Sequence, residues 1–326
     1  MDVLWLSQKD VAGLGLTMAE IIEAVEQGFA AHGRGEVELP AKIGVHPRHD
    51  CFLHAMPCHV GGAVDRTGIK CVSGYPSNPA KGLPYINGVH CMFEASTGRV
   101  LAVMDCAWIT AWRTGAASGV YAKYFAGPEA ASVAIVGCGV QGRVNLLAMK
   151  EVLPNLREVR AYDPFPAQVE RFAADLGPQL PKAAFTTCTT AREAVTGADV
   201  VITCTPIVEK PERFIPAAWL KDETLAIAVD YDAAFNADVF AAGPFVADDS
   251  RQYLETQALG VYFQNGYPGP GQVYAGLGEV VAGVKPAVRA GRRGAVLMGI
   301  ALDDIMTAEL VYRRAREKGV GRTVEL

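Results

Sequence analysis

The chain has 326 residues, 50% of them hydrophobic, which is enough for about two domains with apolar cores of their own. It carries 30 Lys and Arg against 35 Asp and Glu, so the chain has no excess of positive charge to bind the phosphates of a nucleic acid. This excludes nucleic acid as the main partner. No apolar run reaches the roughly 18 residues of a membrane span, and the N-terminal segment lacks the build of a signal peptide. We therefore expect a cytoplasmic protein without a membrane partner.

Eight cysteines occur without a CxxC pair, mostly in apolar, strand-like surroundings. This is typical of reduced, buried thiols in a reducing compartment. Cys51, His54, Cys58 and His59 lie close together in the sequence, but their spacing matches no zinc-ligand pattern. We therefore expect no metal site.

The first part of the chain predicts a domain of mixed α and β structure. A capping box at Thr17 opens a run of apolar residues at helical spacing that ends near Gly33. Residues 39–103 form short β-rich runs separated by Gly, Pro and Asn, which favour a mixed or antiparallel sheet. Residues 109–125 are rich in small residues and predict a helix, after which Gly127 and a proline interrupt the chain.

From about residue 130 the pattern changes to alternating strands and helices, which predicts a doubly wound parallel sheet and an α/β fold class. The expected strands are short apolar runs: Ser132–Val136, Glu158–Tyr162, Ala184–Cys188, Val200–Cys204, Leu225–Val229 and Phe245–Ala247. A last helix is expected over Ala295–Lys318, followed by a tail that returns to the first domain. The predicted organisation is an α+β domain over residues 1–126, completed by residues 294–326, and a Rossmann domain over residues 127–293.

The strongest motif is Gly137-Cys138-Gly139-Val140-Gln141-Gly142, which matches the GxGxxG pattern of dinucleotide-binding loops. It follows the buried-strand pattern SVAIV and precedes a helix, which is the context the motif requires. The glycines would allow a tight turn, an approach of the backbone to a pyrophosphate, and close packing of the helix on its strand. The N–H groups at the helix N-terminus would meet the phosphates.

Asp163 ends the next expected strand, about 20 residues beyond the motif, where a carboxylate can bind the ribose hydroxyls of the adenosine. An acid at this position would repel a 2′-phosphate, so NAD is predicted as the cofactor rather than NADP. The alternative is a surface Asp that starts a turn before Pro164.

Two cations stand in unusually apolar surroundings. Lys70 lies within GIKCVSGY, and Arg113 lies within ITAWRTGAAS. A Lys on a strand usually points to solvent, and Arg113 could likewise be a charge on a helix surface. If both are buried they need an anion, and a substrate carboxylate would supply it, with Arg forming a bidentate pair.

A carboxylate, Asp232 in Asp230-Tyr231-Asp232, follows the apolar strand LAIAV. Ligands of doubly wound sheets bind beyond the carboxyl ends of the strands, so this acid would face the reacting side of the cofactor. It would act as a general acid or base, or would hold an ammonium group. The alternative is a helix N-cap or a loop carboxylate.

The chain resembles the ornithine cyclodeaminase/mu-crystallin family over nearly its whole length. The similar segments occur in the family's order and spacing: GIKCVSGYPSNPAKGLP, TGRVLAVMD, ITAWRTGAAS, IVGCGVQGR and, at the C-terminus, GIALDDIMTAELVYRRAREKGVG. The resemblance implies a Rossmann domain and a second domain that binds substrate and dimerises. The family includes NAD-dependent cyclodeaminases, ketimine reductases, amino-acid dehydrogenases and the hormone-binding mu-crystallin.

Position by position, the resemblance implies that Lys70, Arg113 and Lys42 bind the substrate carboxylate and that Asp232, the catalytic acid, and Lys70 are the catalytic residues. The implied cofactor contacts are Thr114, Gly137, Gly139, Val140, Gln141, Gly142, Asp163 and Thr205. His54 stands where cyclodeaminases carry a Glu that holds the distal amino group. The acid also follows Asp230 and Tyr231 instead of Gly and a small residue, which would place a bulky ring and an extra charge near the substrate.

These observations lead to three functional hypotheses. The first is an NAD(H)-dependent imine reductase or amino-acid dehydrogenase that acts at the C–N bond of a small α-amino or α-imino acid, in a homodimer. The second is an ornithine-type cyclodeaminase that releases ammonia and recycles NAD internally. The third is a mu-crystallin-like binding protein without turnover.

Overall fold

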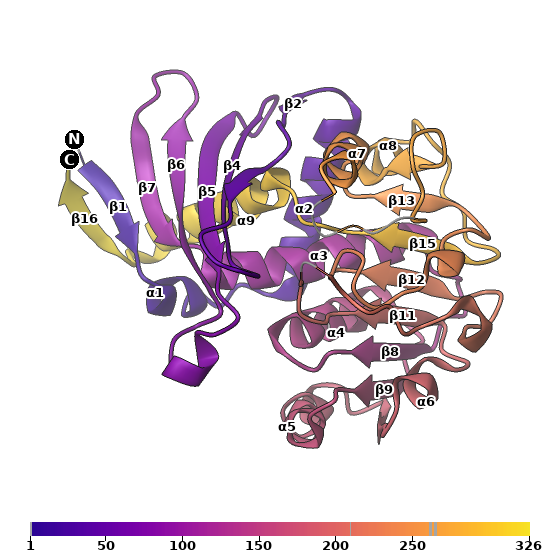
Figure 1. Cartoon of the computed structure of the whole chain (residues 1–326). Coiled ribbons are helices and arrows are strands. Elements are labelled where there is room, and N and C mark those ends of the chain that lie inside the picture. The colour runs from indigo at the N-terminus through magenta and orange to yellow at the C-terminus, as the bar shows by residue number, and fades with distance from the viewer. Residues whose placement is uncertain (1, 209, 261–262, 264–265) are drawn as a thin grey trace. The chain divides into compact units, whose positions relative to one another are not determined.

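The computed structural model describes residues 2–208, 210–260, 263 and 266–326. By its internal contacts the chain divides into two compact units (Figure 1). Unit 1 comprises Met1–Arg113 and Ile300–Leu326, and unit 2 comprises Thr114–Gly299. The divisions thus fall at residues 113 and 299, whereas the sequence patterns placed them at residues 126 and 293.

Unit 1 contains an eight-stranded mixed sheet in the order β16-β1-β7-β6-β5-β4-β2, with β3 paired to β4. The strands are β1 Asp2–Leu6, β2 Val37–Glu38, β3 Ile43–Val45, β4 Phe52–Val60, β5 Arg66–Gly74, β6 Ile86–Glu94, β7 Val100–Asp105 and β16 Arg322–Glu325. The central strands are antiparallel and β1 joins β7 in parallel, which confirms the predicted mixed sheet. The C-terminal tail returns as predicted, because β16 pairs with β1.

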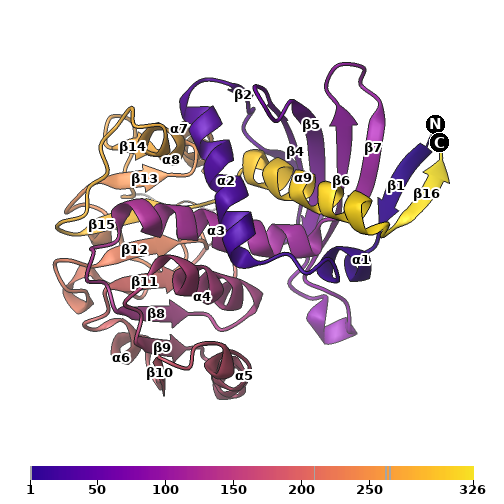
Figure 2. The same ribbon diagram turned by 180° about the vertical axis from the view of Figure 1, so that it is seen from behind.

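Three helices of unit 1 lie on one face of this sheet (Figure 2): α1 Gln8–Ala12, α2 Met18–Gly33 and α9 Ala301–Lys318. The 3₁₀ turn η1 Pro79–Lys81 lies in the connection between β5 and β6, and helix α3 Ala107–Phe125 crosses the division at residue 113. Thr17 caps α2 through a capping box, as predicted. The alternation of side chains along β5 explains why Lys70 is buried. Lys70 shares the buried face of the strand with Gly68 and Val72, whereas the residues between them are only partly buried. Helix α9 packs against this strand.

The predicted start of the last helix was wrong. Helix α9 begins at Ala301, and Arg293–Val296 instead form strand β15 in the sheet of unit 2. The run GAVLMGI is continuously apolar, and periodicity alone cannot distinguish a buried strand from a buried helix in so short a run.

Unit 2 is a doubly wound parallel sheet in the order β10-β9-β8-β11-β12-β15-β13-β14, as the strand and helix alternation predicted. Its strands are β8 Ser132–Val136, β9 Glu158–Tyr162, β10 Ala184–Thr187, β11 Val200–Thr203, β12 Leu225–Ala228, β13 Phe245–Ala247, β14 Ala275–Gly276 and β15 Arg293–Val296. Strands β8 and β11 are neighbours although β9 and β10 separate them in sequence. The loops after them therefore meet at the topological switch point, where ligands of such sheets bind.

The helices of unit 2 lie between its strands in the sequence. They are α4 Val140–Val152, α5 Pro166–Leu176, α6 Ala191–Val195, α7 Ser250–Ala258 and α8 Leu277–Val281, together with the 3₁₀ turns η2 Gly177–Gln179, η3 Ala217–Trp219 and η4 Ala237–Val239. Within the part of the chain that the structure describes, no helix has the length and apolar character needed to cross a membrane.

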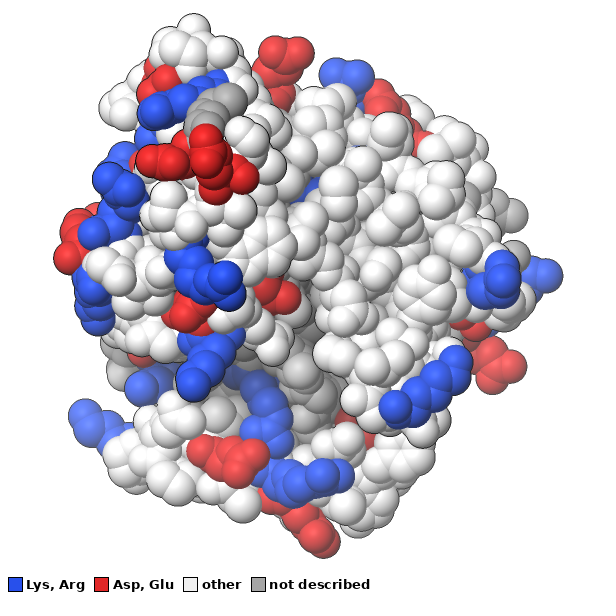
Figure 3. All heavy atoms as spheres, turned by 90° about the vertical axis from the view of Figure 1, so that its left-hand side faces the viewer, with Lys and Arg blue, Asp and Glu red and all other residues white. Residues whose placement is uncertain are grey.

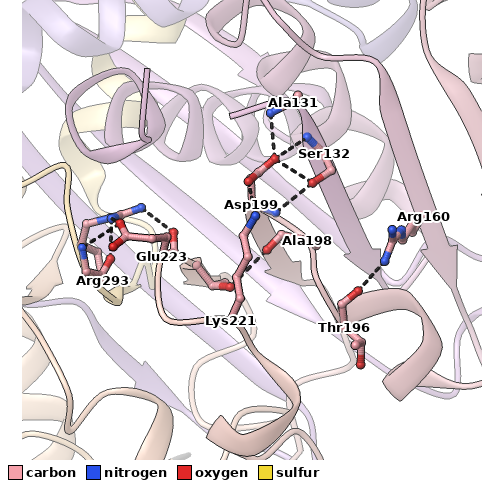
Figure 4. Close-up of polar contacts among 11 residues, drawn as sticks. Ala131, Ser132, Arg160, Thr196, Ala198, Asp199, Lys221, Glu223 and Arg293 are labelled. Atoms are coloured by element: carbon pink, nitrogen blue, oxygen red, sulfur yellow. Dashed lines mark hydrogen bonds and ion pairs between the residues drawn. The ribbon is translucent and has the colours of Figure 1, made fainter. Parts of the chain in front are cut away.

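The amino ends of β8 and β11 are joined by Asp199 (Figure 4). Its carboxylate accepts hydrogen bonds from the backbone N–H of Ala131 at 2.8 Å and of Ser132 at 2.9 Å, from the Ser132 hydroxyl at 2.7 Å, and from the Lys221 ammonium. Burial opposes ionisation, but the hydrogen bonds from Lys221, Ala131 and Ser132 outweigh it and hold the pKa of Asp199 below its ordinary value.

We expect Asp199→Asn to lower the free energy of unfolding by about 2 kcal/mol at pH 7, because several charge-assisted hydrogen bonds are lost. The folded-state pKa lies below the unfolded one, so this contribution is complete above the unfolded pKa of about 4 and disappears as the pH falls through the folded pKa. Urea unfolding should show a smaller difference in the free energy of unfolding between wild type and Asp199→Asn at pH 3 than at pH 7. The fully exposed Asp222 is the control, and Asp222→Asn should change little at either pH.

Candidate active site

The three glycines of the GxGxxG loop in unit 2 have two different roles. Gly137 has φ of +99°, and a Cβ there would lie 2.5 Å from the carbonyl oxygen of Cys204 on the neighbouring strand's loop. A Cβ on Gly142 would lie 2.1 Å from the carbonyl oxygen of Gly137. Gly139 is the N-cap of α4, and no atom of the described residues lies within 4 Å of a Cβ built on it. The first two are thus required by the fold, whereas the third leaves a cradle at a helix N-terminus.

This contrast gives a pair of matched variants. We expect Gly139→Ala to unfold at the wild-type temperature but to bind NADH at least tenfold more weakly, because the methyl group would fill the space that a pyrophosphate approaches. Gly142→Ala should instead lower the melting temperature and NADH affinity together. Thermal unfolding and NADH fluorescence titration measure both properties. Unchanged NADH affinity in a folded Gly139→Ala protein would rule out phosphate binding at this loop.

The loop is held by the carboxylate at the end of β9. Asp163 accepts a hydrogen bond from the Cys138 N–H at 2.9 Å and another from the Phe165 N–H at 3.0 Å. The second bond forms the turn considered as the alternative for Asp163, and the first ties this acid to the glycine loop. At the start of α4, Val140 is exposed, and the buried Oε1 atom of Gln141 has no hydrogen-bond partner among the described residues. The glycines, the helix N-terminus and this carboxylate fit a dinucleotide.

The loop after β11 is organised by Asp230. This buried carboxylate accepts hydrogen bonds from the Thr203 hydroxyl at 2.6 Å, from the Thr205 hydroxyl at 2.6 Å and from the Thr205 N–H at 3.0 Å. Tyr231 has φ of +60° and packs inside the core of unit 2. Both side chains thus have partners within unit 2, and the expectation that they add a ring and a charge near the substrate stays a prediction.

Asp232 lies beyond β12 and is fully buried. Both of its oxygens accept hydrogen bonds from Arg213, through Nε and through Nη2 at 2.7 Å. The guanidinium in turn lies 4.6 Å from the centre of the Tyr267 ring. A carboxylate held bidentately by a guanidinium has a fixed orientation, which suits it to orient a water molecule or to stabilise a cation.

Unit 1 contains the two predicted cations, and both are buried. The Lys70 ammonium lies 2.6 Å from Oδ2 of Asp304, and Arg113 lies 3.1 Å from Oδ1 of the same residue and 3.8 Å from Asp303. The alternatives in which either cation lies on the surface are therefore wrong. The anions that the burial requires are present within the protein itself, in the first turn of α9.

Burial also sets the protonation of this cluster. It lowers the pKa of Lys70 to about 8, although the charge of Asp304 counteracts it. It lowers the pKa of His90, the residue opposite Lys70 on β6, to about 4. Lys70 is consequently cationic at neutral pH, whereas His90 is neutral.

His54 lies on β4, half-buried and stacked on Phe52 with ring centres 4.3 Å apart. Burial and the charges of Lys42, His46 and Lys70 lower the pKa of His54 to about 3. The structure thus places Lys42 and Lys70 close enough to His54 for their charges to act on it. Within unit 2, Thr114 is buried near the start of that unit on α3. Among the described residues no group of three or more His, Cys, Asp or Glu side chains is arranged to hold a metal ion.

Comparison with known proteins decides the family. The sequence profile of the ornithine cyclodeaminase/mu-crystallin family matches residues 2–319. The chain belongs to this family. Two relatives are an alanine dehydrogenase from Archaeoglobus fulgidus, 31% identical over 100% of this chain and 99% of that protein, and the Thermococcus litoralis Δ1-pyrroline-2-carboxylate reductase, solved with NADH and L-proline. The latter is 30% identical, covers 99% of this chain and 100% of its own, and has a TM-score of 0.88.

A second similar solved structure is that of an archaeal alanine dehydrogenase, a dimer with bound NAD. It is 30% identical to this chain, covers 100% of both chains, and has a TM-score of 0.87. These matches confirm the predicted family and the predicted α/β fold with a parallel sheet and a mixed sheet.

The sequence patterns did not identify three residues that pair with the predicted site residues, namely Arg213, Asp303 and Asp304. Arg213 lies in a segment without periodicity, and nothing in KPERF distinguishes it from a surface Arg. Two adjacent acids within the apolar α9 were a usable signal, because acidic residues are rarely buried unless they are paired.

Proposed function

We propose that the enzyme catalyses the NAD(H)-dependent interconversion of a small α-imino acid and the corresponding α-amino acid, with Lys70 and Arg113 binding the carboxylate. The observation that carries this proposal is the pair of buried cations in unit 1, in a chain whose unit 2 carries the dinucleotide loop. Two relatives point to the same chemistry, since one is named a pyrroline-carboxylate reductase and the other an alanine dehydrogenase.

The cofactor is NAD, as two of the similar structures contain NADH or NAD. In this chain Gly139 and the N-terminus of α4 would take the pyrophosphate, and Asp163 would take the adenosine ribose. The Asp163 carboxylate disfavours a 2′-phosphate. Val140, Gln141, Thr114 and Thr205 are proposed as further contacts. When bound, the reduced cofactor supplies the hydride that reaches the α-carbon.

The protein's own groups would bind and orient the substrate. Lys70 and Arg113 fix the carboxylate at one end, and this positioning removes part of the entropic barrier, worth several kcal/mol. Asp232, held by Arg213, orients a water molecule that protonates the imine nitrogen, or itself exchanges that proton. Its negative charge also stabilises the cationic iminium form.

The surroundings of His54 favour reduction over cyclodeamination. A cyclodeaminase must hold a distal ammonium group, which calls for an anion. Here His54 is neutral at physiological pH, and the two nearby lysines, Lys42 and Lys70, would repel a second cation. We therefore place a neutral or acidic substrate side chain, and not that of ornithine, next to His54.

A paired assay on the purified protein tests this proposal. One arm offers NADH with Δ1-pyrroline-2-carboxylate, or with pyruvate and ammonia, and follows NADH consumption. The other arm offers ornithine or lysine with catalytic NAD and follows ammonia release. We expect NADH consumption in the first arm alone. Ammonia release without net change in NADH, or no turnover in either arm, would contradict the proposal and favour the cyclodeaminase or the binding protein, respectively.

We also propose that the enzyme is a homodimer formed through unit 1. The sheet face opposite α9 exposes large apolar side chains at Ile43, Val45, Leu53, Val89 and Trp5. Figure 3, which looks from the side of β1 and β16, shows a broad area without charged side chains. Exposed apolar areas of this kind mark contacts between proteins. Sedimentation at twice the mass of the chain is expected, and Leu53→Glu should yield monomers.

We also propose a cytoplasmic location, because the cysteine thiols of the chain are free. All eight cysteines are free, and five of them are buried. Free thiols persist in a reducing compartment. Fractionation of the cells that produce the protein tests this location.

A further inference from the structure

The first turn of α9 presents one carboxylate to both of the buried cations in unit 1. Asp304 lies 2.6 Å from the Lys70 ammonium through Oδ2 and 3.1 Å from the Arg113 guanidinium through Oδ1. Lys70 belongs to β5 and Arg113 to α3, so one side chain joins three elements. All three residues are buried, so the removal of one of them would leave a buried charge without its counter-ion.

The neighbouring acid, Asp303, lies 3.8 Å from Arg113. Asp304 contacts both cations, so its loss would remove an anion from each of them. An ammonium has three donors, and Asp304 occupies one direction around Lys70, so the lysine can be held by an acid and still bind a further anion.

We propose that Asp304 is a positioning residue, which orients Lys70 and Arg113 toward the substrate carboxylate and keeps Lys70 protonated. This inference rests on the proposed function, in which these two cations bind that carboxylate. Asp304 does not touch the substrate in this arrangement, and it acts through the two cations.

The pH dependence of the reaction would report this role. The charged or titratable groups around Lys70 are Asp304 on α9, Arg113 on α3, Cys106 before α3, His90 on β6 and His54 on β4. The pKa of Cys106 is raised to about 12, and those of His90 and His54 are lowered to about 4 and about 3, all chiefly by burial. Of these groups, Lys70 alone has a pKa near 8, so the loss of carboxylate binding on the alkaline side follows its deprotonation.

The test compares two variants of the same helix. Asp304→Asn removes the charge beside Lys70, and Glu309→Gln removes an equally buried charge that pairs with Arg66 and Arg313. The kinetics of imine reduction are measured from pH 6 to pH 10 with Δ1-pyrroline-2-carboxylate and NADH, together with NADH affinity and thermal unfolding. For Asp304→Asn we expect KM for the imine to rise at least tenfold and the alkaline limb of kcat/KM to move to lower pH, with NADH affinity unchanged.

For Glu309→Gln we expect a lower melting temperature without a change in KM or in the alkaline limb. Asp304→Glu retains the charge but displaces it by one methylene, so KM should rise while the alkaline limb stays in place. This variant also keeps the test decisive if Asp304→Asn does not fold.

The outcomes separate this inference from the proposed function. If the wild type reduces no imine, the proposed function fails and the inference falls with it. If the wild type is active but the Asp304 variants match Glu309→Gln in KM and in pH profile, only the inference is overturned. A lower KM in Asp304→Asn would also overturn it, because Asp304 would then compete with the substrate carboxylate.

Discussion

Replacing Lys70 by methionine is expected to lower kcat/KM for the imino acid by about 10²- to 10³-fold while NADH affinity stays unchanged. Lys70 is fully buried, and the loss of one partner from a buried charge pair costs about 3–5 kcal/mol. Each 1.4 kcal/mol corresponds to about a factor of ten in rate. NADH affinity should not change, because the dinucleotide loop belongs to unit 2 and Lys70 to unit 1. Steady-state kinetics and NADH fluorescence titration test the two parts separately.

The same substitution also leaves Asp304 buried without its nearest cation, so the protein should become less stable. Arg66→Met is the matched control, because Arg66 lies on the same strand and pairs with the buried Glu309 of the same helix at 2.7 Å. It should lose comparable stability but keep its activity. The double variant Lys70→Met/Asp304→Asn should recover stability without recovering activity. Normal kcat/KM in folded Lys70→Met would show that Lys70 does not bind the substrate.

Replacing Asp232 by asparagine is expected to lower kcat by 10²- to 10⁴-fold, the range that general acid–base catalysis contributes. The amide retains the shape of the side chain but loses the charge that stabilises an iminium and orients a proton-donating water. The effect should fall on kcat more than on KM, because the proton moves during the chemical step. Single-turnover reduction with NADH bound in excess separates this step from product release.

Loss of the Asp232 charge also weakens its two hydrogen bonds from Arg213, so stability must be measured in parallel. Asp199→Asn serves as the control within the same sheet, since Asp199 joins the opposite, amino ends of the strands. It should destabilise unit 2 without lowering kcat. If the two variants lose activity in proportion to stability, Asp232 is a structural residue and the proposed proton transfer is wrong.

Local patterns determined much of this protein. The capping box at Thr17, the alternation of strands and helices after residue 130 and the GxGxxG pattern can each be recognised in the sequence, and the structure has all three. The steric reason for Gly142 is local, because a Cβ there would meet the carbonyl oxygen of Gly137. The steric reason for Gly137 is tertiary, because a Cβ there would meet the carbonyl oxygen of Cys204 after the neighbouring strand.

Tertiary structure decided what neutralises the buried charges. The sequence indicated that Lys70 and Arg113 needed an anion, but Asp304 follows Lys70 by 234 residues and Arg113 by 191, and it reaches them only when α9 packs on β5. Arg213 meets Asp232 in the same way, through a loop without periodicity. The end of β15 and the start of α9 were also decided by packing, because a short apolar run suits a strand as well as a helix. Local propensity acts over a few residues, whereas charge pairing acts through space, so the sequence alone determined the elements and the tertiary structure determined their partners.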